Sequence, residues 1–204
     1  MPNNPNPKKI YDQDTELIEK INSGRQDLFE RLVLRYEQKL FNFGYRMCGD
    51  ASDSEDLVQE TFLNTFKYLK SFRFETKFKN WLYRVAASIC IKKRRKSKHA
   101  PERELSLDEF IPREGEHMPS EIPNWASLPL DNVLNNELAN IIKEAILSLP
   151  KKYRLVIVLR DLEGFSTLET AEILKLTASN VKVRLHRARL FLREHLKSYF
   201  SHDK

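Results

Sequence analysis

Residues 164–189 read GFSTLETAEILKLTASNVKVRLHRAR, and this stretch decides how the C-terminal part of the chain folds. Ser166 and Glu169 stand three residues apart, the spacing at which each side chain can cap a backbone N–H of the other at a helix start. We therefore expect a helix over about 167–175 and, after a short turn in which Thr177 serves as N-cap, a second helix. Two helices joined in this way form a helix-turn-helix unit.

The second of these helices is predicted to have an apolar face and a basic face. The apolar stripe consists of Val181, Leu185, Ala188 and Leu192. These positions recur at the helical period and should face a core. The exposed face carries Ser179, Asn180, Lys182, Val183, Arg184, His186 and Arg187. A basic exposed face is most often merely solvated, but the capped helix and tight turn before it favour a helix that lies in the major groove of DNA.

Within such a groove, different side chains are expected to contact the bases and the phosphates. Lys182 and His186 are expected to donate to base edges, and Val183 to contact a thymine methyl group. Arg184 and Arg187 are expected to hold phosphates, which positions the protein on the duplex.

Upstream of this unit the chain is also predicted to be helical. No proline occurs between Lys8 and Pro101, and apolar residues recur at helical spacing. Brief interruptions are expected at Ser23-Gly24, at residues 48–50 and at residues 71–77. The predicted inward stripes are Leu28, Leu32, Tyr36 and Leu40, followed by Leu57, Phe62, Phe66 and Leu69. This pattern indicates a compact helical bundle.

Residues 155–159, with the sequence LVIVL, would be compatible with a strand if they stood alone. Pro150 suits the first turn of a helix, and Gly164 suits the position just after its end. We therefore expect a buried helix between them.

The whole chain is predicted to be all-α, with two helical domains joined by an acidic, Pro-rich linker. Its parts are a disordered tail (1–13), a helical bundle (14–99), the linker (100–132) and the helix-turn-helix domain (133–200). Residues 1–100 hold 20 Lys and Arg against 13 Asp and Glu, residues 101–131 hold 2 against 8, and residues 132–204 hold 13 against 8. The two basic parts suit a polyanionic partner, and the acidic part does not.

Composition also argues against several other classes of protein. Cys48 and Cys90 lie far apart, which predicts neither a metal cluster nor a disulfide framework, although one bridge between them stays open. No stretch approaches the roughly 20 apolar residues that span a bilayer, and the N-terminus lacks an apolar signal segment. We expect a cytoplasmic protein without membrane insertion, metal or cofactor.

Residues 72–81, FRFETKFKNW, mix aromatic rings with cations. Unpaired bases stack on such rings while cations follow the backbone of a single strand, but most such rings in proteins belong to a core, so both interpretations stay open. A helix is predicted to begin at Trp81, and one of its faces carries Arg84, Ser88, Lys92 and Arg95. Its basic end can bind phosphate or complement the helix dipole.

A third surface is predicted on the helix that contains Leu57. Beside the inward stripe lie Asp56, Gln59, Glu60 and Leu63. Acidic residues at a helix start can simply complement its dipole, and Gln59 and Glu60 are either solvated or part of an acidic docking surface.

The motifs together resemble extracytoplasmic-function sigma factors, a branch of the sigma-70 family. Residues 56–62 (DLVQETF) and 78–86 (FKNWLYRVA) resemble their conserved second region. Residues 149–154 (LPKKYR), 163–166 (EGFS) and 181–189 (VKVRLHRAR) resemble their fourth region. The resemblance covers roughly residues 14–98 and 133–197 in the expected order.

The resemblance implies a subunit that binds core RNA polymerase and directs promoter-specific initiation, and not an enzyme. Asp56, Gln59, Glu60 and Leu63 would dock on the clamp helices of the largest subunit, and the C-terminal domain would meet the flap of the second-largest subunit. The residues implied in binding and melting the minus-ten element are Phe72, Arg73, Lys77, Trp81, Arg84, Ser88, Lys92 and Arg95.

By the same resemblance, the exposed face of the second helix in residues 164–189 would read the minus-thirty-five element as duplex. The acidic linker would thread toward the active site and the RNA exit channel, and an anti-sigma factor is expected as a regulator. Two positions depart from the family pattern: Ser88 stands where many relatives have Asn, and Thr170 where a large aliphatic residue is common.

Two other classes fit the sequence less well. A response regulator or autoinducer receptor shares this type of helix-turn-helix but needs a phospho-acceptor domain or ligand pocket upstream, and the N-terminal half offers neither. A recombinase or nuclease needs a nucleophile or a metal-binding carboxylate cluster, whereas the acidic residues here lie on a helix face and in the linker.

Overall fold

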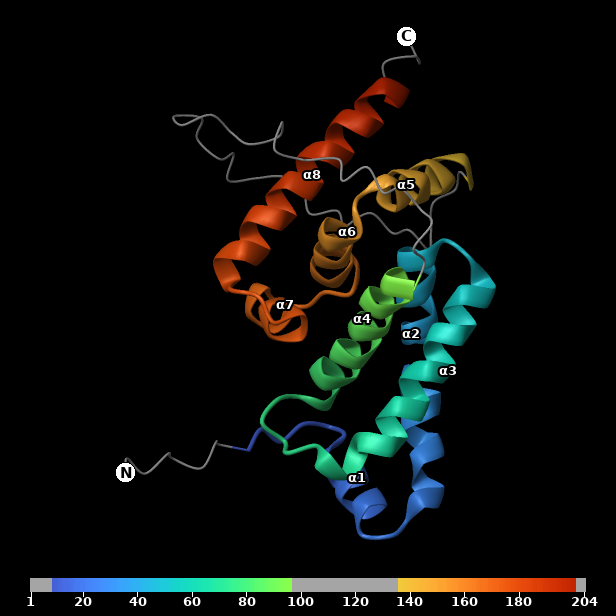
Figure 1. Ribbon diagram of the computed structural model, residues 1–204, viewed down its shortest axis with the longest axis vertical. Coiled ribbons are helices and arrows are strands. Elements are labelled where there is room, and N and C mark those ends of the chain that lie inside the picture. The colour runs from blue at the N-terminus through green and yellow to red at the C-terminus, as the bar shows by residue number, and fades with distance from the viewer. Residues whose placement is uncertain (1–8, 97–135, 201–204) are drawn as a thin grey trace.

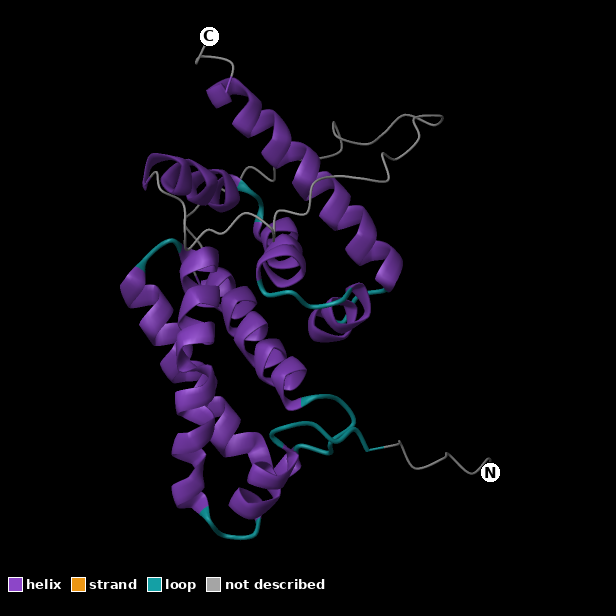
Figure 2. Cartoon of the chain, turned by 180° about the vertical axis from the view of Figure 1, so that it is seen from behind, coloured by secondary structure: helices purple, strands orange, loops and turns teal. Residues whose placement is uncertain are grey.

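The computed structural model describes residues 9–96 and 136–200 as helices joined by short loops, with no strand in those ranges (Figures 1 and 2). The N-terminal domain consists of α1 (Thr15–Asn22), the 3-10 turn η1 (Gln26–Leu28), α2 (Phe29–Cys48), α3 (Ala51–Tyr68), the 3-10 turn η2 (Leu69–Ser71) and α4 (Phe78–Lys96). The C-terminal domain consists of α5 (Asn136–Ser148), α6 (Lys151–Ile157), the π-helical turn η5 (Val158–Leu162), α7 (Thr167–Leu174) and α8 (Ala178–Phe200). The predicted all-α class is confirmed, and the predicted linker at 100–132 lies outside the described residues.

The N-terminal domain is built on the helix pair α2 and α3. Gly49 ends α2 with a φ of 80°, a left-handed conformation that glycine adopts without strain. Asp50 then caps α3 by accepting a hydrogen bond of 2.9 Å from the backbone N–H of Asp53. Leu32, Tyr36 and Leu40 of the predicted stripe are fully buried in the core.

The predicted inward stripe of α3 is wrong at one position. Its other three members are buried, but Phe66 is 47% exposed. The buried face of α3 includes Thr61 and Thr65, and Phe66 is turned by about 100° around the helix from Thr65. Its ring lies edge-on against Phe29, with ring centroids 5.0 Å apart.

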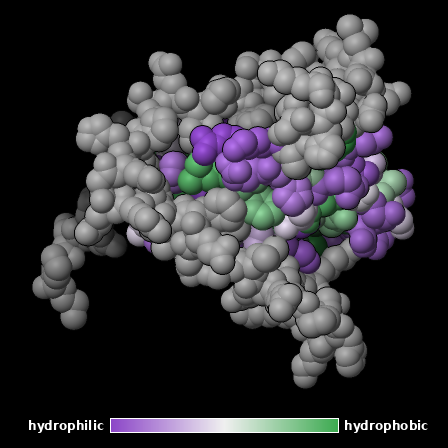
Figure 3. Space-filling model, turned by 90° about the horizontal axis from the view of Figure 1, so that it is seen from above, coloured by the Kyte–Doolittle hydropathy of each residue, from purple (hydrophilic) through white to green (hydrophobic). Residues whose placement is uncertain are grey.

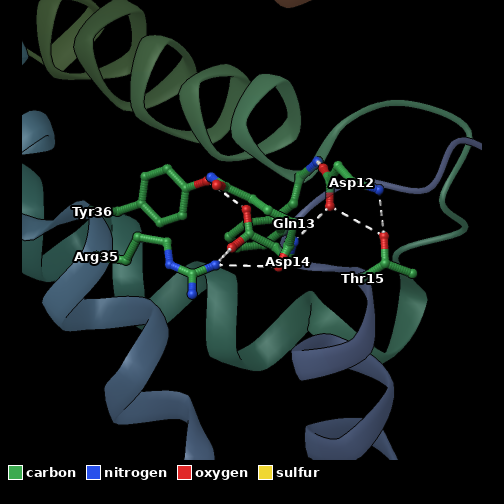
Figure 4. A network of polar contacts seen from close by, with 7 residues as sticks. Asp12, Gln13, Asp14, Thr15, Arg35 and Tyr36 are labelled. Atoms are coloured by element: carbon green, nitrogen blue, oxygen red, sulfur yellow. Dashed lines mark hydrogen bonds and ion pairs between the residues drawn. The ribbon is translucent and has the colours of Figure 1, made fainter.

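Residues 9–13, which the sequence assigned to a disordered tail, are hydrogen-bonded to the bundle. Asp12 accepts from the backbone N–H of Phe78 at 2.6 Å. It also accepts from the hydroxyl of Thr15 at 3.1 Å (Figure 4). Because Asp12 caps it, α4 begins at Phe78 and not at Trp81 as predicted. The predicted disorder therefore does not extend over these five residues.

A buried carboxylate ties the start of α1 to α2. Asp14 is 1% exposed, accepts a hydrogen bond of 2.5 Å from the hydroxyl of Tyr36 and forms an ion pair with Arg35 (Figure 4). Burial, together with this carboxylate, raises the pKa of Tyr36 above its ordinary value.

In the C-terminal domain, the apolar run at 155–159 is helical, as predicted. Pro150 precedes α6 as its N-cap and does not lie in the first turn, and Gly164 follows η5 with a φ of 73°. The capping box is present: the N–H of Glu169 donates to Ser166 Oγ at 3.1 Å, and the N–H of Ser166 donates to Glu169 Oε2 at 2.9 Å. These bonds confirm the predicted start of α7.

The two domains pack against each other, with α7 beside α4 (Figures 1 and 2). The ring of Phe165 lies edge-on against Tyr83 of α4, with centroids 4.8 Å apart. Arg154 of α6 donates to the main-chain oxygen of Met47 at 2.7 Å. The contact therefore combines aromatic packing with polar bonds.

The described surface is mixed in character. Seen from above, hydrophilic residues surround small apolar areas (Figure 3). Within residues 9–96 and 136–200, no helix has both the length and the apolar character required to cross a membrane.

Candidate nucleic-acid interface

Helix α8 presents its two faces in the predicted directions. The apolar stripe of Val181, Leu185, Ala188 and Leu192 is buried, with exposed fractions of 0–8%. On the other side Ser179, Asn180, Lys182 and Val183 are exposed, and Arg184, His186 and Arg187 are half-buried. The residues predicted to contact duplex DNA therefore lie together on one helix outside its core stripe.

The first turn of α8 is fixed by the predicted cap. Thr177 Oγ1 accepts from the backbone N–H of Asn180 at 3.2 Å and from its side-chain amide at 3.1 Å. The short turn before it begins at Lys175, whose φ of 54° closes α7. These local bonds set the angle at which α8 leaves the turn.

An ion pair that the sequence did not single out anchors α8 to the rest of the domain. Arg189 donates from Nε to Asp161 Oδ2 at 2.8 Å and from Nη2 to Asp161 Oδ1 at 2.7 Å. Asp161 lies in η5 and is 2% exposed. A bidentate pair of this kind fixes orientation as well as distance. Its two residues are 28 positions apart in the sequence, so no local sequence pattern predicts this ion pair.

Among the predicted base-contacting residues, His186 has a perturbed pKa. Burial lowers it, and the neighbouring cations Arg189, Arg187 and Arg193 lower it further. The lowered pKa favours the neutral imidazole, which offers one donor and one acceptor. Its Nε2 atom has no hydrogen-bond partner among the described residues.

The aromatic segment at 72–81 is largely core in this structure. Phe72, Phe74 and Phe78 are 7%, 9% and 0% exposed. The ring centroid of Phe72 lies 4.9 Å from that of Phe74 and 5.4 Å from that of Trp81. Trp81 is half-buried. The role of Phe72 in binding and melting the minus-ten element stays a prediction, and stacking of its ring on a base requires the ring to leave this cluster.

The loop that carries these rings has an unusual backbone. Phe74 has a φ of 60°, a left-handed conformation that is rare and costly for a residue other than glycine. Its carbonyl accepts a hydrogen bond of 2.7 Å from the N–H of Ile10. The N-terminal segment thus helps to hold the loop in its strained form.

Four of the five cations predicted to contact the minus-ten element have described side chains, and they fall into two groups. Arg73 and Lys92 are exposed. Lys77 is ion-paired with Glu169 at 2.9 Å, and Arg84 with Glu172 at 3.0 Å. Both glutamates belong to α7 of the other domain.

The two remaining predicted minus-ten residues lie further along α4. Ser88 is half-buried, and its hydroxyl donates to the carbonyl of Val85 within the same helix at 2.8 Å. Arg95 lies in the last turn of α4, where side chains are outside the described part of the structure.

The face of α3 predicted to meet the polymerase is solvent-exposed. Asp56, Gln59, Glu60 and Leu63 are all exposed, and Leu63 is 66% exposed. Phe66, which the sequence placed in the core, lies one turn further and extends the apolar part of this face. An acidic surface with an apolar edge suits a protein partner of opposite charge.

Two family models match the chain, in the order of its two domains. Sigma-70 region 2 matches residues 32–100, and Sigma-70, region 4 matches residues 139–192. The chain is also 39% identical over 180 residues to the ECF RNA polymerase sigma factor SigW of Bacillus subtilis (strain 168), a match that covers 88% of this chain and 95% of that relative.

Solved structures share the fold. CnrH in complex with the cytosolic domain of CnrY matches with a TM-score of 0.64 and 25% identity, covering 95% of this chain and 100% of that one. The sigma factor RpoE in complex with the anti-sigma factor NepR from Bartonella quintana matches with a TM-score of 0.59 and 26% identity, covering 83% and 96%.

Proposed function

The chain belongs to the extracytoplasmic-function sigma factors of the sigma-70 family, and we propose that it binds core RNA polymerase, directs it to specific promoters and takes part in melting their DNA. One observation carries the proposal: a single chain holds a helix with a basic, partly exposed face on one domain and cations beside a largely buried aromatic cluster on the other. A regulator that only binds duplex DNA needs just the first of these surfaces.

The exposed face of α3 is the proposed docking surface for the polymerase. Asp56, Gln59 and Glu60 would contact the clamp helices of the largest subunit, while Leu63 and Phe66 supply the apolar contact. The C-terminal domain would rest on the flap of the second-largest subunit. This role is that of a subunit that positions an enzyme and does not itself catalyse a reaction.

The proposed duplex face reads the minus-thirty-five element. It comprises Ser179, Asn180, Lys182, Val183, Arg184, His186 and Arg187 of α8. Among its exposed members, Lys182 and Val183 are suited to base edges, and the arginines of the face are suited to phosphates.

The proposed strand face binds the melted minus-ten element. It comprises Phe72, Arg73, Lys77, Trp81, Arg84, Ser88, Lys92 and Arg95 of the loop before α4 and of α4 itself. Rings that stack on extruded bases, beside cations that follow the phosphates, are the usual means of holding a single strand.

An anti-sigma factor is the proposed regulator, because the similar sigma factor RpoE of Bartonella quintana forms a complex with the anti-sigma factor NepR. The proposed site of action is the cytoplasm, where RNA polymerase works.

Run-off transcription with purified chain, core polymerase and a library of genomic fragments tests the proposal. Specific transcripts should appear only when the chain is added, and the chain should co-migrate with core polymerase. Substituting Asp56, Gln59 and Glu60 together by Ala should abolish co-migration, whereas Lys182→Ala should leave it intact. Absence of both specific transcripts and co-migration would refute the function.

A further inference from the structure

A cavity of about 190 Å³ lies where the two domains meet, and the proposed function assigns no ligand to it. Its apolar walls come from both domains and include Met47 of α2, Ile91 of α4, Leu155 of α6 and Leu176 from the turn before α8. Met47 and Leu155 are buried, whereas Ile91 is 46% exposed. The lining therefore extends from the core to the surface, which makes the cavity accessible to a solute.

Three cations complete the lining of the cavity. Lys151 and Lys152 begin α6, and Arg184 comes from α8. No acidic residue is among the described residues that line the cavity. Within residues 9–96 and 136–200, none of the three cations forms an ion pair with a carboxylate. Lys152 instead has its ammonium 5.3 Å from the ring centroid of Tyr153. The cavity thus carries positive charge that the described residues do not neutralise.

Apolar walls beside unpaired cations indicate the class of ligand. Ligand pockets are mostly apolar, and a few polar groups fix the orientation of the ligand. In another protein a cavity of about 150 Å³ with apolar walls holds benzene, so a cavity of about 190 Å³ has room for one ring or a short alkyl chain. Lysine and arginine donors form strong, charge-assisted hydrogen bonds with a carboxylate. They would repel a cationic head group.

We propose that this cavity binds a small amphipathic anion, a carboxylate that carries a short alkyl chain or a single ring. The apolar part would lie against Met47 and Leu155, and the carboxylate would face the three cations. Because Met47 and Leu155 belong to different domains, the ligand would contact both domains at once. The inference concerns a further binding site and does not depend on the proposed function.

Titration of the full chain with three matched probes tests the proposal. Octanoate has the alkyl chain and the negative charge, acetate has the charge without the chain, and octylammonium has the chain with the opposite charge. Calorimetry measures the affinity, and ¹³C-labelled methyl groups of Met47 and Ile91 report on the cavity by nuclear magnetic resonance. Octanoate should shift both methyl signals saturably and bind about a hundredfold more tightly than acetate, because most of its chain leaves water.

Octylammonium should bind about tenfold more weakly than octanoate, because its charge is repelled. Equal affinities for these two probes would mean that the alkyl chain only partitions onto an apolar surface, and the proposal would be overturned. Octanoate that leaves the Met47 and Ile91 signals unchanged would also overturn it.

Reversing the charge of the two lysines tests the contact with the head group. Lys151→Glu with Lys152→Glu should weaken octanoate binding about tenfold. Glutamate suits the first turn of a helix, so this variant should fold like the wild type. Lys67→Glu with Lys70→Glu is the matched control: both lysines are exposed, the net charge changes equally, and Lys67 also lies over the ring of the next residue, at 5.4 Å. Equal loss in both variants would mean that net charge alone attracts the anion, contrary to the proposal.

Filling the cavity tests the apolar contact. Leu176→Trp enlarges a half-buried wall and should abolish the shift of the Ile91 signal by octanoate. Leu168→Trp is the control, because Leu168 is 74% exposed on α7 and does not line the cavity. Thermal unfolding establishes whether each variant is folded. A folded Leu176→Trp variant that binds octanoate as the wild type does would show that the chain does not enter this cavity. If Leu176→Trp does not fold, the lysine variants decide the test.

Discussion

The duplex face and the strand face are built in opposite ways. Lys182 and Val183 of α8 point into solvent, and Val183 is 45% exposed. On the strand face, Phe72 is 7% exposed within an aromatic cluster, and Lys77 and Arg84 are occupied by carboxylates. The proposed reader of duplex DNA is therefore exposed, and the proposed reader of the single strand is partly covered.

The difference follows from what each form of DNA offers. The edges of base pairs are accessible in the major groove, so a rigid helix with exposed side chains is enough to read them. An unpaired base has to be stacked on a ring or enclosed in a pocket. Large exposed rings would be a liability in the free protein, and packing Phe72 within its aromatic cluster avoids that liability.

The largest effect should come from the ion pair that supports the duplex face. Asp161→Ala leaves Arg189 without its nearly buried partner, and we expect the free energy of unfolding to fall by about 4 kcal/mol. Urea unfolding followed by circular dichroism measures the loss. Asp27→Ala, which breaks the exposed pair with Arg25, should change little. If both variants are equally stable, α8 does not depend on this anchor.

A somewhat smaller effect is expected at Phe72 on the strand face. Phe72→Ala removes a buried ring and should cost about 3 kcal/mol of stability. Phe72→Leu keeps most of the apolar volume but lacks the ring that stacks on a base. The leucine variant should co-migrate with core polymerase yet fail to open promoter DNA, measured by permanganate reactivity of the melted region. Normal opening by Phe72→Leu would show that this ring is only a core residue.

The sequence predicted those features of the two faces that depend on contacts between residues close together in the chain. The stripe of α8 and the Ser166–Glu169 capping box involve residues within a few turns, and the structure confirms both. Phe66 was misplaced because the inward face of α3 is occupied partly by threonines, which apolar periodicity does not register.

Contacts between distant residues were beyond the reach of sequence patterns. Asp12 caps α4 across 66 residues, and Arg46 meets Glu163 across 117. Nothing near Glu163 in the sequence indicates which cation it will meet. For the same reason, residue types alone predicted a strand-binding composition at 72–81 but not that α7 would cover part of it.

A smaller effect, on DNA binding, is expected from substituting either of two residues of the duplex face. Lys182→Ala should cost about 1 kcal/mol at one base pair and so change which promoters are preferred. Arg187→Ala should weaken binding to all sequences alike and reduce the slope of log affinity against log salt by about 1. Binding to a randomised duplex library at several salt concentrations separates the two. Identical selectivity profiles would contradict the assignment of base contact to Lys182.

The smallest effect should appear as a pH dependence at Glu169, which belongs to the helix that covers the strand face. The backbone N–H of Ser166, helped by the hydroxyl of Ser166 and by Lys77, lowers the pKa of Glu169 from 4.5 to about 2. Since the pKa is depressed by folding, the carboxylate stabilises the protein above about pH 4.5, and this stability is lost as the pH falls toward 2.

Because the Lys77 side chain is largely exposed, solvent screening should reduce the contribution of Glu169 to about 1 kcal/mol. Urea unfolding at about pH 5 and about pH 3 should therefore show a steeper loss for the wild type than for Glu169→Gln, which cannot titrate. Equal losses in the two proteins would mean that Glu169 carries no such linkage. The wild type should lose stability more steeply and should expand at the lower pH, whereas the glutamine variant should already be expanded at about pH 5. That result would place the titrating group at the contact between Glu169 and Lys77.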